Sequence, residues 1–183
     1  MGLSSSFFGQ KFGISERDLD RYLGEALSRG ADYADLYFEY LATSSISIDE
    51  SIVKSATQGV SLGVGVRVIS GERTGYAYSD DLSPAKILKA AATAACIADS
   101  PSKVDTVGLT SSLKHDLYPV LRAPIDQPLE ERVLFVKRAD AAARAKDARV
   151  IQVQASYADS LRHVLVATSD GKLSFDRQPM ARL

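Results

Sequence analysis

The sequence is poor in the side chains that cross-link chains, bind metals or cross membranes. Its 183 residues include one cysteine, Cys96, two histidines, His115 and His163, and no tryptophan. A single thiol excludes an intrachain disulfide and is typical of a reducing compartment, so we expect a cytoplasmic protein. No apolar run approaches the roughly 20 residues of a membrane span, and the N-terminus lacks a secretory signal.

The chain also lacks an excess of either charge. Its 22 basic and 23 acidic residues leave a formal net charge of −1, with 45% hydrophobic and 25% charged residues. This composition is ordinary for a globular protein and excludes a disordered tail or a long coiled coil. A balanced charge also removes the usual electrostatic argument for binding nucleic acid, so we expect no direct nucleic-acid contact.

The first 14 residues carry no clear periodicity, and we interpret residues 1–14 as a flexible N-terminus ahead of one domain over residues 15–183. Residues 1–6 also match the pattern for N-myristoylation. Because that pattern is short and degenerate, we favour the interpretation of these residues as a flexible N-terminus. From Ser15 the pattern predicts a helix, since Ser15 is a capping residue with Asp18 three positions later. Apolar residues then recur at helical spacing on one face.

Alternation of apolar and polar residues predicts four strands, over residues 34–40, 46–52, 60–68 and 73–78. Because the four runs are close in sequence, we expect an antiparallel meander, with a turn at residues 70–72. Glycines 63 and 65 lie on one face of the third run, which favours close approach by another element. Gly63-Val64-Gly65 is a poor match to a nucleotide-binding loop, because it lies inside a strand.

Two further helices and a β segment complete the prediction. Ser83-Pro84 opens one helix, and Pro128 opens another whose buried stripe is expected to be apolar. Between them residues 99–128 have no period. Two strands over 151–157 and 161–168, an Asp170-Gly171 turn and a last strand from Leu173 follow, with Pro179 at a sheet edge or outside the sheet. The fold class is therefore α+β, an antiparallel meander packed with two to three helices plus a C-terminal hairpin segment.

No residue is assigned a catalytic, cofactor-binding or metal-binding role. His115-Asp116 is half of a catalytic pair or a solvated loop histidine, and we favour the second. His163 is interpreted as a cross-strand polar side chain, and Cys96 as a small packed residue of a helix. Four carboxylates, of Asp35, Glu39, Asp49 and Glu50, either hold a hard cation or form a solvated sheet face, and we favour the solvated face.

The chain resembles a known family in residue order as well as composition. Residues 31–39 (ADYADLYFE), 59–80 (GVSLGVGVRVISGERTGYAYSD) and 165–171 (LVATSDG), with the ending Pro179-x-x-Arg182-Leu183, are similar to the N-terminal domain of the TldD subunit of the TldD/PmbA (TldE) metallopeptidase family. The resemblance runs from about Ser15 to Leu183. Since no natural domain end is evident at Leu183, we expect a fragment of a longer protein.

The resemblance implies a zinc-dependent metallopeptidase that hydrolyses unfolded peptides, in peptide maturation and antitoxin degradation, as a heterodimer with a TldE/PmbA-like subunit. The family's zinc motif, His-Glu-x-x-x-His with a further cysteine, is absent here, so this chain is expected to be non-catalytic and to hold no cofactor. It would then supply part of the substrate cleft and subunit interface. The alternative is a non-catalytic module that binds DNA gyrase or another regulatory protein. Whether the native protein is an enzyme depends on a zinc motif beyond Leu183.

Overall fold

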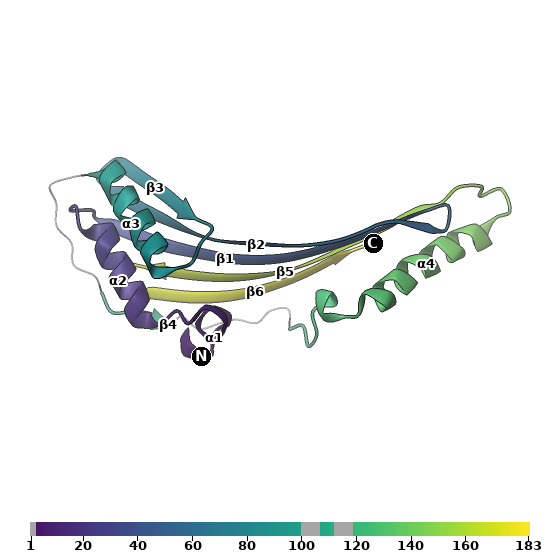
Figure 1. Ribbon diagram of the computed structural model, residues 1–183, viewed down its shortest axis with the longest axis horizontal. Coiled ribbons are helices and arrows are strands. Elements are labelled where there is room, and N and C mark those ends of the chain that lie inside the picture. Colours follow the sequence, from purple (N-terminus) through teal and green to yellow (C-terminus); the bar gives the residue numbers. More distant parts are fainter. Residues whose placement is uncertain (1–2, 100–106, 112–118) are drawn as a thin grey trace. The chain divides into compact units, whose positions relative to one another are not determined.

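The computed structural model of the chain describes residues 3–99, 107–111 and 119–183. It contains one sheet in the order β3-β2-β1-β5-β6-β4 (Figure 1). The mixed, mostly antiparallel arrangement confirms the α+β class. The strands are β1 (Tyr33–Asp49), β2 (Ile52–Ser70), β3 (Arg73–Ser79), β4 (Thr110–Ser111), β5 (Gln154–Thr168) and β6 (Lys172–Arg182); the helices are α1 (Phe7–Phe12), α2 (Glu16–Leu27), α3 (Pro84–Ala98) and α4 (Leu129–Lys146), with short 3₁₀ turns η1 (Leu3–Ser5) and η2 (Pro124–Asp126).

Two compact units share the long strands. Unit 1 comprises residues 1–40, 62–115 and 163–176, and unit 2 comprises residues 41–61, 116–162 and 177–183. Helices α1, α2 and α3 belong to unit 1, and α4 belongs to unit 2. No helix in the described part of the chain is long and apolar enough to cross a membrane.

The first two predicted strands are one strand in the structure. Residues 41–45 continue β1 to Asp49, and β2 begins at Ile52 after a turn at Glu50 and Ser51, which both have positive φ. Two residues with positive φ are what a tight hairpin of twisted strands requires. The polar stretch that interrupts the apolar pattern is held by cross-strand hydroxyl bonds, of Ser45 with Thr57 and of Ser47 with Ser55, both 2.7 Å.

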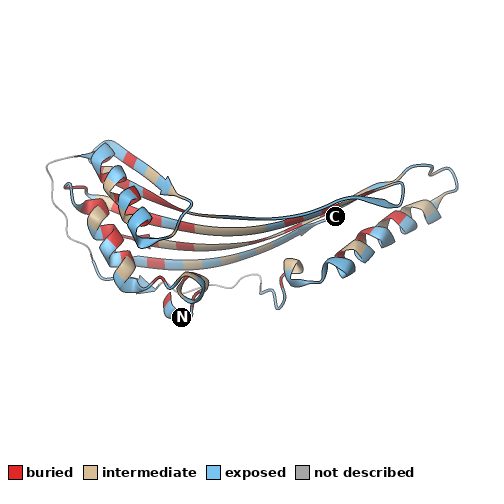
Figure 2. Cartoon of the chain, viewed as in Figure 1, coloured by how far each residue is buried: buried red, intermediate tan, exposed pale blue. Residues whose placement is uncertain are grey.

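The core of unit 1 lies between α2, α3 and one face of the sheet. Leu36 and Phe38 of β1 and Val66 and Val68 of β2 are fully buried there (Figure 2). The Ser15–Asp18 capping box predicted for α2 is present, with the Ser15 hydroxyl accepting from the Asp18 amide and Asp18 accepting from the Ser15 amide. Pro84 is the first residue of α3, as predicted.

Residues 3–14, interpreted from the sequence as part of a flexible N-terminus, contain η1 and α1. Ser6 caps α1 by accepting from the Gly9 amide, and Gly13 ends the helix at φ 68°. Phe8 is 1% exposed within the core of unit 1. Sequence periodicity missed α1 because it spans six residues, which is too short for a helical repeat to be visible.

The close approach predicted at Gly63 and Gly65 is made elsewhere, at Gly75. A Cβ added to Gly65 would meet the side chain of Tyr76 from the neighbouring strand, and one added to Gly63 would lie 3.1 Å from the Ser79 carbonyl oxygen. At Gly75, by contrast, it would lie 3.0 Å from the Ala98 nitrogen and closer still to a carbonyl oxygen of α3. The small residue that lets α3 pack on the sheet is therefore in β3.

We predict that Gly75→Ala lowers the free energy of unfolding by about 1–3 kcal/mol, because the methyl group overpacks a rigid helix backbone. Gly24→Ala is the matched control. Gly24 is an exposed residue inside α2 with no atom within 4 Å of an added Cβ, so the same substitution should stabilise by about 0.5–1 kcal/mol. Urea denaturation measures both, and equal effects of the two substitutions would contradict the close approach.

The C-terminal segment forms a hairpin, as predicted, but its first arm is one strand, β5, and not two strands over 151–157 and 161–168; residues 151–153 lie outside it. Asp170 and Gly171 lie in the turn, with Gly171 at φ 87°, and β6 runs from Lys172 through Pro179 to Arg182. Strand β4 pairs with β6 only at Lys172 and Leu173. Among the described residues, Pro179 thus lies on a portion of β6 with no second strand partner, the kind of position to which proline in sheets is confined.

Candidate functional site

Strand β3 has one open edge among the described residues. It pairs with β2 alone, in antiparallel register from Ser70 opposite Arg73 to Val64 opposite Ser79. A two-residue turn makes its flanking pair hydrogen-bonded and the bonding then alternates, so Thr74, Tyr76 and Tyr78 direct their backbone groups away from β2. These groups are available to another extended chain.

The sheet face opposite α2 and α3, here called the open face, carries aromatic and charged side chains. Tyr76 and Tyr78 are 58% and 78% exposed, and Tyr37 is 40% exposed. Arg67 donates from Nε and Nη2 to the same carboxylate oxygen of Asp35, at 2.8 and 2.5 Å. These bonds raise the pKa of Arg67, as does the Asp35 charge. Tyrosine and arginine are enriched where proteins contact partners.

A second open edge lies in unit 2, along residues 52–61 of β2. Pairing with β3 reaches only to Val64, and every residue from Ile52 to Ser61 is exposed. On the other edge of this stretch, the hydroxyl pairs of Ser45 with Thr57 and of Ser47 with Ser55 place β1 directly alongside. The stretch contains one charge, Lys54, and no proline.

Helix α4 is held in unit 2 by a buried ion pair. Arg132 Nη1 lies 3.1 and 3.3 Å from the Asp159 carboxylate oxygens and 2.6 Å from Ser44 Oγ, and both charged side chains are at most 4% exposed. Tyr157 packs beside the pair, and burial raises its pKa, helped by the Asp159 charge. The buried residues of α4 are Arg132, Val136 and Asp140. The apolar stripe predicted from the sequence comprises Leu129, Val133, Val136, Ala139 and Ala143, and of these only Val136 is fully buried, whereas Leu129 is exposed.

We predict that Asp159→Ala lowers the free energy of unfolding of unit 2 by about 3–5 kcal/mol, because it leaves the Arg132 charge buried without its partner. The double substitution Arg132→Met with Asp159→Leu should recover most of that loss. Arg149→Ala is the control, since the Arg149 side chain in its ion pair with Asp147 is 90% exposed, and its loss should leave the free energy of unfolding close to that of the parent. Denaturation followed by hydrogen exchange in α4 measures all three. A double substitution as damaging as Asp159→Ala would show that burial of the charge is not the cause.

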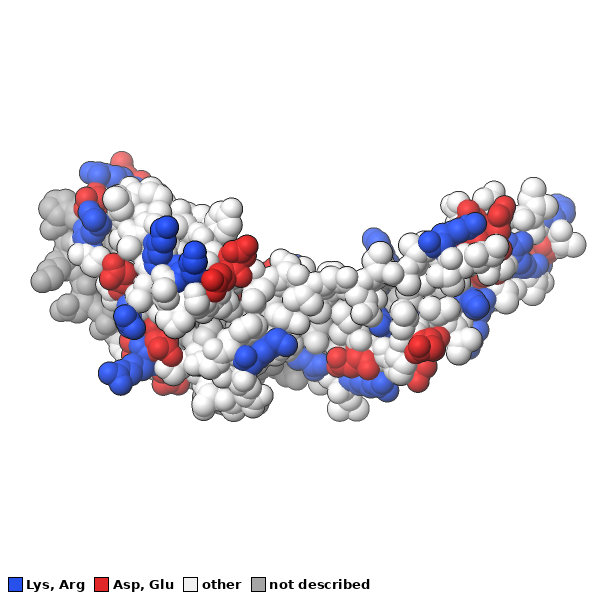
Figure 3. All heavy atoms as spheres, in the orientation of Figure 1, with Lys and Arg blue, Asp and Glu red and all other residues white. Residues whose placement is uncertain are grey.

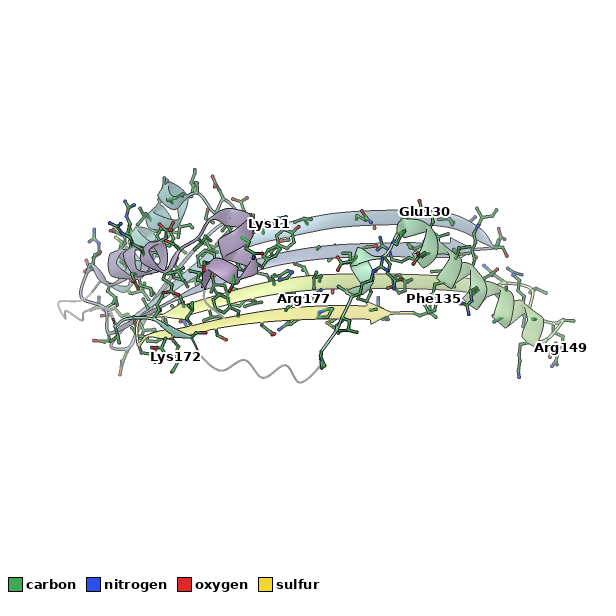
Figure 4. All side chains as sticks on the ribbon, turned by 90° about the horizontal axis from the view of Figure 1, so that it is seen from below. Lys11, Glu130, Phe135, Arg149, Lys172 and Arg177 are labelled. Carbon is green, nitrogen blue, oxygen red and sulfur yellow. The ribbon has the colours of Figure 1, made fainter. Side chains whose placement is uncertain are left out.

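A groove of about 790 Å³ runs beside α4 within unit 2. Leu134 and Phe135 of α4 line it and are 59% and 45% exposed, and the chain's last residues, 181–183, line it too. Arg138 also lines the groove. Glu130 and Phe135 project from the helix in Figure 4. On the face shown in Figure 3, basic and acidic side chains are interspersed rather than gathered by sign.

The histidines and the cysteine considered in the sequence do not form a site in the described residues. His163 stacks on Phe7 at 3.8 Å between ring centroids, with Lys11 5.7 Å above the same Phe7 ring. His163 therefore contributes to docking α1. Cys96 is exposed on α3 rather than packed, which corrects that interpretation. The pair at residues 115–116 lies outside the described residues.

The four carboxylates considered as cation ligands are not gathered into one site, and Glu50 lies in the turn between β1 and β2. Asp35 binds Arg67, and Glu39 accepts a 2.8 Å hydrogen bond from the Tyr37 hydroxyl. Asp49 lies in unit 2 and accepts from Gln152 at 3.3 Å. Over residues 3–99, 107–111 and 119–183 no three His, Cys, Asp or Glu side chains come together as a metal site would require. The donor set of these residues therefore does not fit a zinc ion.

Sequence reasoning did not find the open edges or the buried ion pair. Arg132 and Asp159 are far apart in sequence; Arg132 lies in a predicted helix, and Asp159 lies between the predicted strands 151–157 and 161–168. The only local signal of the β2 edge is that residues 52–61 are short-chained and nearly uncharged. That composition also predicts a loop, and residues 53–59 lie between the predicted strands 46–52 and 60–68.

The sequence of the chain matches a family of metallopeptidases. Residues 34–98 match the family model for the PmbA/TldA metallopeptidase domain 1, and residues 122–183 match the model for the PmbA/TldA metallopeptidase central domain. The two models describe consecutive parts of one kind of protein. The chain belongs to the PmbA/TldD metallopeptidase family.

Individual relatives agree with this assignment. A metalloprotease TldD homolog of Haemophilus influenzae is 34% identical over 167 residues, which is 85% of this chain and 33% of that protein. The homolog of Buchnera aphidicola subsp. Schizaphis graminum is 30% identical over 91% of this chain and 35% of its own length. The chain thus spans about a third of the length of these curated relatives.

Solved structures show the same fold at lower identity. A Thermotoga maritima protein, named as a proposed modulator of a DNA gyrase, superposes with a TM-score of 0.71 at 18% identity, over 91% of this chain and 38% of that one. TldE of Thermococcus kodakarensis gives a TM-score of 0.68 at 20% identity, over 90% and 37%.

Proposed function

We propose that residues 15–183 form a non-catalytic region of a TldD-like zinc metallopeptidase of the cytoplasm, and that this region helps to build the substrate cleft and the subunit interface. The observation that carries the proposal is the donor set. The family is a metallopeptidase family, yet the sequence has two histidines 48 positions apart and no His-Glu-x-x-x-His. The metal and the residues that activate water would come from the remaining two thirds of such a protein.

The open edge of β3 is the surface that best suits an extended peptide. A peptide added as a strand would bond to the outward backbone groups of Thr74, Tyr76 and Tyr78. Alternate side chains of the peptide would then lie beside the exposed rings of Tyr76 and Tyr78 on the open face. Recognition through the backbone explains a preference for unfolded chains, because folded proteins offer few free strands.

The groove beside α4 is the surface that best suits a second subunit of the TldE/PmbA type. Leu134 and Phe135 expose apolar area next to Arg138, and this combination of aromatic, aliphatic and arginine side chains is typical of the centre of protein interfaces. A neighbouring subunit would bury these side chains. The similarity to a TldE structure supports a partner of that kind.

We predict that the purified chain binds no stoichiometric zinc and cleaves no peptide, because no three zinc ligands are brought together in its described part. Mass spectrometry of the native protein measures bound metal, and a fluorogenic peptide measures cleavage. A full-length TldD-type protein with its partner is the positive control, and a chelator should abolish its activity. One tightly bound zinc ion per chain would overturn the proposal.

We also predict that Tyr76→Pro abolishes binding of an extended peptide while leaving the fold intact. The Tyr76 amide faces the open edge, so proline removes a donor the peptide needs without breaking a bond to β2. Ala77→Pro is the comparison, since the Ala77 amide faces β2 and its loss should lower stability instead. Peptide anisotropy titration and thermal unfolding separate the two effects. Unchanged peptide binding by Tyr76→Pro would exclude this edge.

The alternative function is a binding module that acts on DNA gyrase or another regulatory protein. The name of the Thermotoga maritima neighbour favours it. A chelator distinguishes the two, because it should stop proteolysis by a full-length protein and leave simple binding unchanged.

A further inference from the structure

The β2 edge over residues 52–61 is left without a strand partner by the described residues, and it is not protected against acquiring one. Natural edges are protected by charges, proline or covering segments. The edge of β6 in unit 2 has all of these. It carries Pro179 and Arg182, while Arg177 contacts the carbonyl oxygen of Val120 and the carboxylate of Asp126. The β2 edge has Lys54 alone.

From this contrast and from the order of its side chains, we infer that two copies of this chain pair through residues 52–61 of β2. The two strands run antiparallel about a twofold axis at Ala56, and each copy extends the other's sheet. Closed twofold pairing of identical surfaces is the commonest arrangement of homo-oligomers. The inference concerns unit 2 and does not depend on peptide binding at β3.

The register follows from the two faces of a strand. Residues that lie directly opposite each other on two antiparallel strands point to the same face of the sheet. Within one strand the even-numbered residues point to one face and the odd-numbered residues to the other. Each opposed pair must therefore be two even or two odd residues, which requires the twofold axis to pass through a residue and not between two. An axis at Ala56 places Ile52 opposite Val60 of the copy. The Ile52 and Val60 side chains are 60% and 62% exposed in the single chain, and this pairing covers them in both copies. An axis at Ser55 or Thr57 would instead set Ile52 opposite Gln58, or Val60 opposite Lys54.

An axis at Ala56 also places the polar side chains of the edge opposite polar side chains of the copy. Lys54 meets Gln58 of the copy, so no two like charges are opposed. Ser55 meets Thr57 of the copy, and each already bonds across to β1 at 2.7 Å. The hydroxyl pairs would thus continue from β1 through β2 into the second chain. A peptide of unrelated sequence would not place apolar side chains opposite both Ile52 and Val60. A second copy of the chain is therefore the better partner for this edge.

Cross-linking tests the register directly. Cys96 is exposed and is first replaced by serine. In that background, Ala56→Cys should join to itself through a short bis-maleimide, because the two copies meet at this residue. Ile52→Cys alone should not, whereas a mixture of Ile52→Cys and Val60→Cys chains should join efficiently. Efficient linking of Ile52→Cys to itself, with none in the mixture, would overturn the register.

Sedimentation velocity over a wide concentration range tests the association itself. The parent chain should show a reversible monomer–dimer equilibrium, and Ala56→Lys should abolish it by opposing two lysines at the axis. Ala141→Lys, at an exposed position of α4 outside the groove lining, is the control and should associate like the parent. A parent that stays monomeric at every concentration would overturn the inference, as would an Ala56→Lys chain that dimerises unchanged. Binding of an extended peptide to this edge in place of dimerisation would overturn it too.

Discussion

Backbone amides and carbonyls at a sheet edge require partners, and the arrangement of this protein follows from which edges have them. Helices α2 and α3 cover one face of unit 1 but leave the outer backbone of β3 open. Beyond Val64 the partner strand of β2 ends, and residues 52–61 become an edge. The β6 edge is protected by proline and by arginine contacts, whereas the β2 edge is not. Among the described residues, the proposed functions therefore rest on open edges and on the groove beside α4, rather than on a cluster of reactive side chains.

The small core of unit 2 explains why a buried ion pair is tolerated there. Among the described residues of unit 2 the buried apolar side chains are few, namely Ile46, Ile48, Ala123, Val136, Tyr157 and Leu161. The pair between Arg132 and Asp159 orients α4 on the sheet, and Ser44 Oγ accepts a further hydrogen bond from the same Nη1. This arrangement turns Leu134 and Phe135 outward and creates the groove. The charge that docks the helix thus also determines which apolar side chains remain for a partner.

The family assignment and the chemistry of the described residues are consistent with each other. A metallopeptidase needs a set of metal ligands, and the described residues place Asp35, Glu39 and Asp49 in separate interactions. The relatives are about three times as long as the matched region, which leaves ample chain for a metal site elsewhere. In the proposed function, this region would supply surfaces for extended chains and subunits, and the remainder of the protein would supply the reaction.

Local pattern in the sequence determined the helices that directly follow Ser15, Ser83 and Pro128, and the β2–β3 and β5–β6 turns. These elements in turn indicate the α+β class. Local pattern was enough because helix starts, glycine turns and periodicity depend on residues only a few positions apart. The order of residues 31–39 and 59–80 was also enough to indicate the family. The tertiary structure alone decided that residues 33–49 are one strand, that Gly75 rather than Gly65 meets a helix, and that Arg132 faces Asp159. These features depend on contacts between residues distant in the chain, which no local pattern encodes. The open edges also depend on distant residues. A strand is an edge strand when no other part of the fold pairs with it, and its own sequence does not determine that.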